Sequence, residues 1–193
     1  FNIEVFGKTD HAGTTPLALR KDALRSSIAI ITALHELTRD PHDITRFTVG
    51  RMLVTPNSPN SVASHVLFSV DVRHPDVATI GRLGAAVEPL ARKAGAPCEV
   101  KVTPTLHDEP CIFDADVVAT IERAANDLAI SSMRLPSGAS HDAMYMARVC
   151  PTGMIFVPCE NGVSHNEAEN ATPEDLAAGA RVLTAALLDL ANR

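Results

Sequence analysis

Two histidines, His141 and His165, lie on either side of a short apolar run, Gly153–Val157, in the second half of the chain. The run is typical of a buried strand, and each histidine falls in one of the polar loops that flank it. Carboxylates accompany both histidines, namely Asp142, Glu160, Glu167 and Glu169. A carboxylate beside an imidazole fixes the tautomer of the ring and raises its basicity as a ligand. This spacing therefore indicates metal binding or acid–base chemistry in the loops around the run.

The residue types also permit a simpler interpretation, in which each histidine is a solvated surface residue. A metal site of the usual kind needs three or four protein ligands, and the spacing around His165 supplies one good candidate. On these residues alone, both interpretations stay open.

The composition is that of a globular protein and argues against a nucleic-acid partner. The chain has 193 residues and a formal net charge of −6, and its 17 Lys and Arg residues are scattered along it. Binding of a phosphate backbone needs a basic face, which this pattern does not provide. The chain has no Trp and one Tyr, so platforms for base stacking are not expected either. The apolar runs are too short to cross a bilayer, and no membrane association is expected.

The cysteines and the first residue of the chain indicate its cellular compartment and whether it is part of a longer protein. The cysteines are widely and irregularly spaced: Cys98, Cys111, Cys150 and Cys159. This spacing suggests neither a zinc knuckle nor a disulfide framework. We interpret Cys98, Cys150 and Cys159 as reduced core or near-core thiols and expect a cytoplasmic protein. The chain begins inside an alternating strand pattern at Phe1, which suggests a piece of a longer protein.

Residues 1–108 are expected to form one α+β domain, in which apolar alternation predicts strands and apolar spacings of three and four predict helices. The expected elements are a strand from Phe1, a helix over Leu17–Thr38, strands over Thr45–Val54 and Val62–Arg73, a helix from Pro75 to Gly95 and a strand over Cys98–Leu106. The first helix is expected to bury the stripe Leu24, Ile28, Ile31 and Leu34 or His35. The order β-α-β-β-α-β is that of a ferredoxin-like sandwich, a four-stranded antiparallel sheet with both helices on one face.

Residues 109–193 are expected to be the C-terminal part of an α/β domain. The predicted elements are helices over Asp114–Ala129 and Asp142–Ala147, a strand over Met154–Val157 and a final helix that Thr172 caps. The apolar stripe of the final helix is Leu176, Ala180, Leu183, Leu187 and Leu190. Because a single buried strand cannot satisfy its own backbone groups, its partner strands are expected upstream of Phe1.

Four sequence blocks, read together and in order, carry a resemblance to a known family. They are DHAGTTP with RKDAL (Asp10–Leu24), PN followed by FSVDVR (Pro59–Arg73), PSGASHDA (Pro136–Ala143) and GMIFVPCENGVSHNEAE (Gly153–Glu169). The chain thereby resembles the dinuclear metal amidohydrolases typified by N-carbamoyl-L-amino acid hydrolase, allantoate amidohydrolase and β-ureidopropionase. The resemblance implies an α/β, zinc-peptidase-like catalytic domain into which a ferredoxin-like lid and dimerisation domain is inserted. Residues 1–108 would be that lid, and residues 109–193 the C-terminal segment of the catalytic domain.

The resemblance also assigns roles to individual residues. His165 matches the last ligand of a pair of divalent metal ions, which would be Zn, Mn or Ni, while most of the other ligands would lie outside this chain. His11 matches the lid histidine that reaches into the active site of the partner subunit and stabilises the oxyanion. Taken alone, His165 could also be a loop histidine in acidic company, and His11 a histidine of a flexible Gly-Thr loop.

Five further residues match substrate-binding positions, and two of them, Arg73 and Asn60, correspond to a pair that binds the α-carboxylate of the substrate. The segment with Gly138, Ser140 and His141 matches a stretch that lines the substrate pocket. Ser140 stands where the family usually has Gly, and a side chain at this point would narrow the pocket or add a hydroxyl donor and so affect which substrate fits. An exposed strand-end Arg and a turn-forming Asn are the simpler alternatives for the first pair.

The implied activity is hydrolysis of a linear amide or ureido C–N bond in an N-carbamoyl amino acid or a related ureido acid, by a homodimer formed through the lid. A peptidase or deacylase of the wider superfamily is a second hypothesis, which the DHAGTTP and PSGASHDA blocks disfavour. A third is that the isolated chain is an inactive module for dimerisation and substrate clamping. We expect the third for these 193 residues alone and the first for the parent protein.

Overall fold

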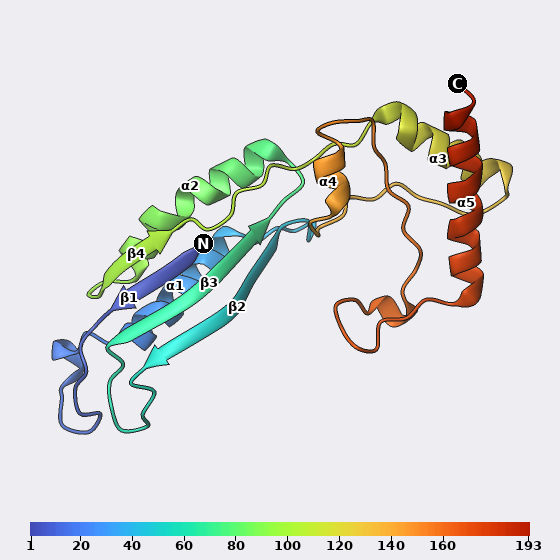
Figure 1. The fold of residues 1–193 in the computed structure, drawn as a ribbon. Coiled ribbons are helices and arrows are strands. Elements are labelled where there is room, and N and C mark those ends of the chain that lie inside the picture. The colour runs from blue at the N-terminus through green and yellow to red at the C-terminus, as the bar shows by residue number, and fades with distance from the viewer. The chain divides into compact units, whose positions relative to one another are not determined.

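The strands of residues 1–110 form where apolar and polar residues alternate in the sequence. The computed structural model describes residues 1–193, and its first part contains β1 (Asn2–Phe6), a 3₁₀ helix η1 (Leu17–Leu19), α1 (Ala23–Leu37), β2 (Arg46–Thr55), β3 (His65–Arg73), α2 (Val77–Ala94) and β4 (Glu99–Thr103). The strands form one antiparallel sheet in the order β2-β3-β1-β4 (Figure 1). The element order β-α-β-β-α-β agrees with the order that the sequence predicts.

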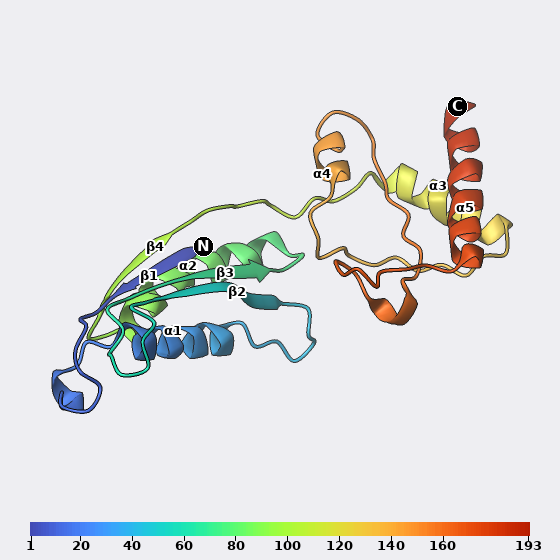
Figure 2. The ribbon, with the colours of Figure 1, turned by 60° about the horizontal axis from the view of Figure 1, so that its bottom comes forward.

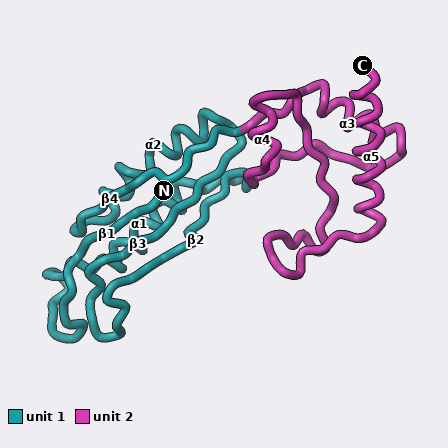
Figure 3. The backbone as a smooth tube through the Cα atoms, in the orientation of Figure 1, with its two compact units in different colours: residues 1–110 teal, residues 111–193 magenta.

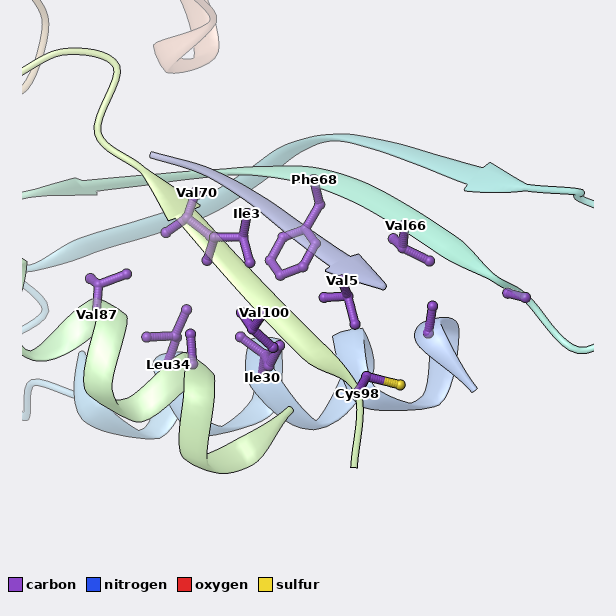
Figure 4. Close-up of a cluster of buried hydrophobic side chains, with 13 residues drawn as sticks. Ile3, Val5, Ile30, Leu34, Val66, Phe68, Val70, Val87, Cys98 and Val100 are labelled. Atoms are coloured by element: carbon purple, nitrogen blue, oxygen red, sulfur yellow. The ribbon is translucent and has the colours of Figure 1, made fainter. Parts of the chain in front are cut away.

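One face of this sheet carries the main hydrophobic core. Alternate strand residues such as Ile3, Val66 and Phe68 point to this face and are fully buried. They pack against Ile30 of α1 and Val87 of α2 (Figure 4). Figure 2 shows α1 running along the sheet on this side. Burial of these side chains stabilises the unit by about 1.5–3 kcal/mol for each large apolar residue.

The first helix begins six positions later than its sequence pattern suggests, at Ala23 rather than Leu17. Asp22 caps it, because its carboxylate accepts hydrogen bonds from the backbone N–H groups of Leu24 and Arg25. The expected apolar stripe is also partly wrong, since the Ile28 side chain is exposed. The buried face consists instead of Ala23, Ser26, Ser27, Ile30 and Leu34. Small residues near the start of this face allow α1 to lie close to the sheet.

Residues 111–193 form a second, separate compact unit, and the division after residue 110 lies close to the boundary expected at residue 108 (Figure 3). This unit contains α3 (Ala115–Asp127), α4 (Asp142–Met146), a 3₁₀ helix η2 (Glu160–Gly162) and α5 (Pro173–Ala191). Thr172 caps α5 as predicted, since its hydroxyl accepts from the N–H of Asp175. The core of the unit is small and joins α3 to α5 through Ala124, Ala125, Val182 and Ala186.

The run Met154–Val157 does not form the predicted strand. It has no regular secondary structure and pairs with no other segment of the chain. It instead lies against α3 and α5. A Cβ atom on Gly153 would approach Val117 of α3 to 2.9 Å, and one on Gly179 of α5 would approach Val157 to 2.5 Å. The prediction failed because a strand needs a partner for its N–H and C=O groups, and the chain offers none.

The apolar stripe predicted for α5 is also not the face that the helix buries. Leu176, Leu183 and Leu187 are half or more exposed, whereas Val182 and Ala186 are buried against α3. The helix is therefore apolar on two sides, and the side with smaller residues makes the closer contact. A helix that is apolar on more than one side is typical of a buried position in a larger domain.

All four cysteines are free thiols in the structure. Cys98 is buried as expected and Cys159 is half-buried, but Cys150 is exposed, so its assignment to the core was wrong. None of the helices is both long and apolar enough to cross a membrane.

Candidate functional site

His11 lies in the loop that follows β1, and this loop pairs with the segment that precedes β3. The backbone of His11 forms an antiparallel bridge with Ser61. In addition, the N–H of Ala12 donates to the carbonyl oxygen of Asn60 at 3.0 Å. The structure therefore brings together two residues that the sequence analysis selected, His11 and Asn60. The Asn60 side chain is held in turn, because its Oδ1 accepts from the Ser58 hydroxyl at 2.7 Å.

The imidazole of His11 has a defined tautomer. Its Nδ1 atom accepts hydrogen bonds from the backbone N–H groups of Gly13, at 3.0 Å, and Thr14, at 3.3 Å. A ring nitrogen that accepts hydrogen bonds carries no hydrogen, so the neutral ring has its hydrogen on Nε2. The residue is exposed and Nε2 makes no hydrogen bond within the chain. His11 thus offers a donor to a group from outside.

Arg73 ends β3 and is held by a carboxylate on the same strand. Its Nε donates to Asp71 Oδ1 at 3.0 Å and its Nη2 donates to Asp71 Oδ2 at 2.7 Å. The hydrogen bond from Arg73 lowers the pKa of Asp71, and the same contact raises the pKa of Arg73. The guanidinium is therefore permanently charged and kept in a fixed plane.

Asn60 and Arg73 do not lie together. Asn60 precedes β3 and Arg73 is the last residue of that strand. At about 3.3 Å per residue, the length of β3 alone separates them by roughly 26 Å. They cannot bind one small carboxylate within a single chain, so the expected pair is divided between the two ends of the sheet.

His141 immediately precedes α4 in the second unit. Its Nε2 lies 2.7 Å from the hydroxyl oxygen of Ser137, and its ring contacts Phe156 edge-on, with 5.4 Å between centroids. The exposed Phe156 belongs to the run that was predicted to be a strand. This contact keeps His141 half-buried and joins the PSGASHDA segment to that run.

Gly138 and Ser140 lie beside His141 in the PSGASHDA segment, and both are exposed. A Cβ atom on Gly138 would meet nothing within 4 Å. The Ser140 hydroxyl makes no hydrogen bond within the chain.

His165 lies in a loop that Glu160 and Asn170 close, since the Asn170 side-chain amide donates to Glu160 at 2.9 Å. His165 has a φ of +54°, an unfavourable left-handed backbone for a residue with a Cβ atom. Its backbone N–H donates to Glu169 at 2.9 Å, which stabilises this conformation. The sequence analysis places Glu167 and Glu169 beside this histidine as possible partners of the ring, but the Glu169 carboxylate binds the backbone instead, and the exposed ring makes no hydrogen bond.

A metal site needs several ligand side chains close together. No group of three or more His, Cys, Asp or Glu side chains lies close enough to hold a metal ion. The imidazole of His165 is exposed and suits a single ligand position. The residues of this chain therefore fit one ligand of a metal centre and do not form a centre by themselves.

Two residues that the sequence analysis did not select act on the selected ones. Asp71 orients Arg73, and the even spacing of the two residues on a strand was the signal that could have revealed it. Arg20, in the RKDAL block, donates to carbonyl groups of the His11 loop. Nothing in the sequence pattern indicates that second contact.

The fold and the candidate site together point to a hydrolase family. The fold is a sheet covered by two helices, and the site includes the four sequence blocks with the exposed His11 and Arg73. Residues 12–189 match the model of peptidase family M20/M25/M40. The chain belongs to this family, which confirms the resemblance found in the sequence.

Within this family, the chain is similar to amidohydrolases and amidases. The chain is 38% identical to the N-carbamoyl-L-amino-acid amidohydrolase of Rhizobium meliloti, over 96% of this chain and 45% of the relative. It is 31% identical to the allantoate amidohydrolase of Escherichia coli K12, over 99% of this chain and 47% of the relative. The structure of an amidase of the hydantoinase/carbamoylase family from Burkholderia multivorans superimposes with a TM-score of 0.90 at 38% identity, over 97% of this chain and 46% of that one. The chain spans about half the length of the relatives that it matches.

Proposed function

We propose that the protein to which this chain belongs hydrolyses a linear C–N bond in an N-carbamoyl amino acid or a related ureido acid. The observation that carries the proposal is the similarity, over 96% of this chain, to an N-carbamoyl-L-amino-acid amidohydrolase. Residues 1–110 would be a ferredoxin-like lid, because their strand order β2-β3-β1-β4 and element order suit that fold. Residues 111–193 would be the C-terminal segment of the catalytic domain.

His11 would stabilise the negative charge that develops on the oxygen of the attacked carbonyl. Its Nε2–H is a donor whose tautomer is fixed by the amides of Gly13 and Thr14. A donor of this kind contributes about 2.7–4 kcal/mol to the lowering of the barrier. Because the donor is already oriented, little reorganisation is needed during the reaction.

Arg73 would bind the carboxylate of the substrate. A guanidinium recognises a carboxylate through two parallel hydrogen bonds, which gives orientation as well as charge. Asp71 holds the guanidinium plane in place before the substrate arrives. Asn60 would serve the active site that His11 serves, because the two lie in paired segments.

The separation of His11 and Arg73 favours a homodimer. His11 and Asn60 lie at the end of the sheet where β3 begins, and Arg73 lies at the end where β3 finishes. A single lid cannot bring both ends to one small substrate, whereas two lids related by a twofold axis can. Each active site would then receive Arg73 from one subunit and His11 with Asn60 from its partner.

The complete enzyme would hold two divalent metal ions, Zn, Mn or Ni, and His165 would be one of their ligands. When bound, such ions activate water and polarise a carbonyl group. This chain supplies no complete set of ligands, so we expect the 193 residues alone to be inactive.

The test of the proposal is substrate discrimination by the whole enzyme. With Arg73→Ala, the KM for an N-carbamoyl-L-amino acid should rise roughly 10–100-fold, as expected for the loss of hydrogen bonds to a charged group. The KM for the corresponding uncharged amide should change little. Arg51→Ala is the matched control, because Arg51 lies on the neighbouring strand and its guanidinium binds Asn2 instead. Equal losses for both substrates would remove Arg73 from carboxylate binding, and turnover of dipeptides alone would favour the alternative, an aminoacylase or peptidase.

A further inference from the structure

A single guanidinium group fastens the loop that carries His11. The Nε of Arg20 donates to the carbonyl oxygen of Thr15 at 2.8 Å, and its Nη2 donates to the carbonyl oxygen of Ala12 at 2.5 Å. These carbonyls stand at the two ends of the turn Ala12–Thr15, directly after His11. Arg20 is partly buried while it makes both contacts, so each is stronger than it would be in water.

The other side of the loop is fastened by backbone pairing. His11 forms a bridge with Ser61, and the carbonyl of Asp10 accepts from the N–H of Val62 at 2.8 Å. The backbone of His11 is therefore held from the side of β3. The turn that follows is closed by a hydrogen bond from the Thr15 N–H to the His11 carbonyl oxygen at 3.2 Å, and Arg20 contacts the carbonyl groups at the two ends of this turn.

The contact with Ala12 reaches the His11 ring through one peptide group. The carbonyl of Ala12 and the N–H of Gly13 belong to the same planar trans peptide, in which C=O and N–H point in opposite directions. Arg20 binds the carbonyl side of this peptide, and the N–H side donates to His11 Nδ1 at 3.0 Å. When Arg20 holds the Ala12 carbonyl in place, it therefore also orients the Gly13 N–H toward His11 Nδ1. A charged donor on the carbonyl also polarises the peptide, which strengthens the hydrogen bond to the ring.

We propose that Arg20 is a positioning residue that fixes the tautomer and orientation of the His11 imidazole through the Ala12–Gly13 peptide. This rests on the proposed role of His11 as the donor to the oxyanion. Arg20 touches no substrate and acts through the turn. Without it the turn keeps the backbone hydrogen bonds of the Ala12 and Thr15 N–H groups but loses the charged donor on their carbonyl groups, so that the Gly13 and Thr14 amides are no longer aimed at Nδ1. The ring then populates the other tautomer and other rotamers, in which Nε2 is not a donor at the required place.

The kinetic test uses the whole enzyme with an N-carbamoyl-L-amino acid as substrate. Arg20→Ala should lower kcat about tenfold or more while KM changes less than about twofold, because an interaction that acts only in the transition state is lost. Arg20→Lys should recover part of kcat, since an ammonium group can reach one of the two carbonyls. Added guanidinium or methylguanidinium ions should restore kcat in Arg20→Ala and have no effect on the wild type.

The matched control is Lys21→Ala. Lys21 is the next residue, carries the same charge, and its side chain makes no hydrogen bond in the chain. A loss of kcat in Lys21→Ala similar to that in Arg20→Ala would overturn the proposal, because it would reduce the effect to local charge. Melting temperatures of all variants separate a loss of positioning from a loss of folding, and Arg20→Lys keeps the test informative if Arg20→Ala does not fold.

The direct readout is ¹⁵N NMR of the histidine-labelled enzyme, with His11→Ala used to assign the signal. The wild type should show His11 with hydrogen on Nε2 and an unprotonated Nδ1. Arg20→Ala should show averaging between the two tautomers. An unchanged ring in Arg20→Ala would overturn the proposal whatever the kinetics show. If His11→Ala leaves kcat unchanged, the proposed role of His11 fails, and the NMR result still decides whether Arg20 controls the ring.

Discussion

At the scale of single residues, the contact between Arg73 and Asp71 fixes the orientation of the guanidinium group that we propose binds the substrate carboxylate. The two side chains are neighbours on one face of β3 and share two parallel hydrogen bonds. Because the pair is half-exposed, its direct contribution to stability is small, about 0–1 kcal/mol. Its larger effect is orientation, since a guanidinium held in one plane loses less freedom when it binds a ligand.

The first prediction concerns Asp71→Asn. Asn keeps the shape of the side chain but loses the charge and one acceptor, so Arg73 is no longer held in one plane. The KM for N-carbamoyl amino acids should rise about tenfold with kcat nearly unchanged, the pattern of lost uniform binding. Steady-state kinetics of the whole enzyme measure this, with Asp43→Asn as the control because Asp43 pairs with Arg46 instead. A lower KM would show that Asp71 competes with the substrate rather than orienting Arg73.

At this scale, the sequence carries a signal for neighbours along an element, although Asp71 was overlooked, and it carries none for partners across loops. Asp71 and Arg73 share a face because side chains alternate along a strand, and this follows from the sequence alone. The proximity of His11 and Asn60 depends on backbone pairing between two loops, which is set by the strand order β3-β1. The contact between Arg20 and Ala12 depends on the path of a loop, and no periodicity describes it.

At the scale of elements, the connection from α1 to β2 is organised by one carboxylate. Asp40 accepts hydrogen bonds from the backbone N–H groups of His42, Ile44 and Thr45. These bonds, led by those from His42 and Thr45, lower the pKa of Asp40 from 3.8 to about 2. The folded state therefore favours the ionised form, and Asp40 contributes stability that is complete above its ordinary pKa and is lost as the pH falls toward 2.

The second prediction follows from the lowered pKa of Asp40. Asp40→Asn should lower the midpoint of urea unfolding at pH 7, because the amide nitrogen that replaces one carboxylate oxygen cannot accept from Ile44 or Thr45. The difference from the wild type should shrink between pH 4 and pH 2, where the wild-type carboxylate itself becomes protonated. Asp43→Asn, in the same connection, should show no such pH dependence, since the Asp43 side chain is 90% exposed. A difference that stays constant from pH 7 to pH 2 would contradict the assignment.

Elements that carry their own boundary signals were predicted well from the sequence, and those that depend on a partner were not. The caps Asp114 and Thr172 begin helices by local hydrogen bonds where the sequence places them, whereas the cap of α1, Asp22, was missed. The run Met154–Val157 has the composition of a strand, yet a strand exists only with a ladder, and the chain provides none. The buried side of α5 was missed because the helix is apolar on two sides, and periodicity does not show which side has a neighbour.

At the scale of the whole molecule, the two units differ in how far they cover their apolar residues. The first encloses a core in which Ile3, Ile30 and Phe68 are fully buried between sheet and helices. The second buries only a few small residues between α3 and α5, and it leaves large apolar side chains in solvent. The most exposed of these are Ile112, Met133 and Val149. Large exposed apolar surfaces mark places where further polypeptide packs.

The last prediction tests this difference by limited proteolysis of the 193-residue chain with a protease of broad specificity. Cleavage requires local opening, and segments with few buried contacts open at the lowest free energy. Residues 131–140 are all exposed and contain neither helix nor strand, so the first cuts should fall there and in the loop around His165. A fragment close to residues 1–110 should persist, and mass spectrometry of the time course would identify it. In the whole enzyme, the same segments should be protected, because the catalytic domain would cover them. Equal resistance of the two units in the isolated chain would contradict the proposal that residues 111–193 are the tail of a larger domain.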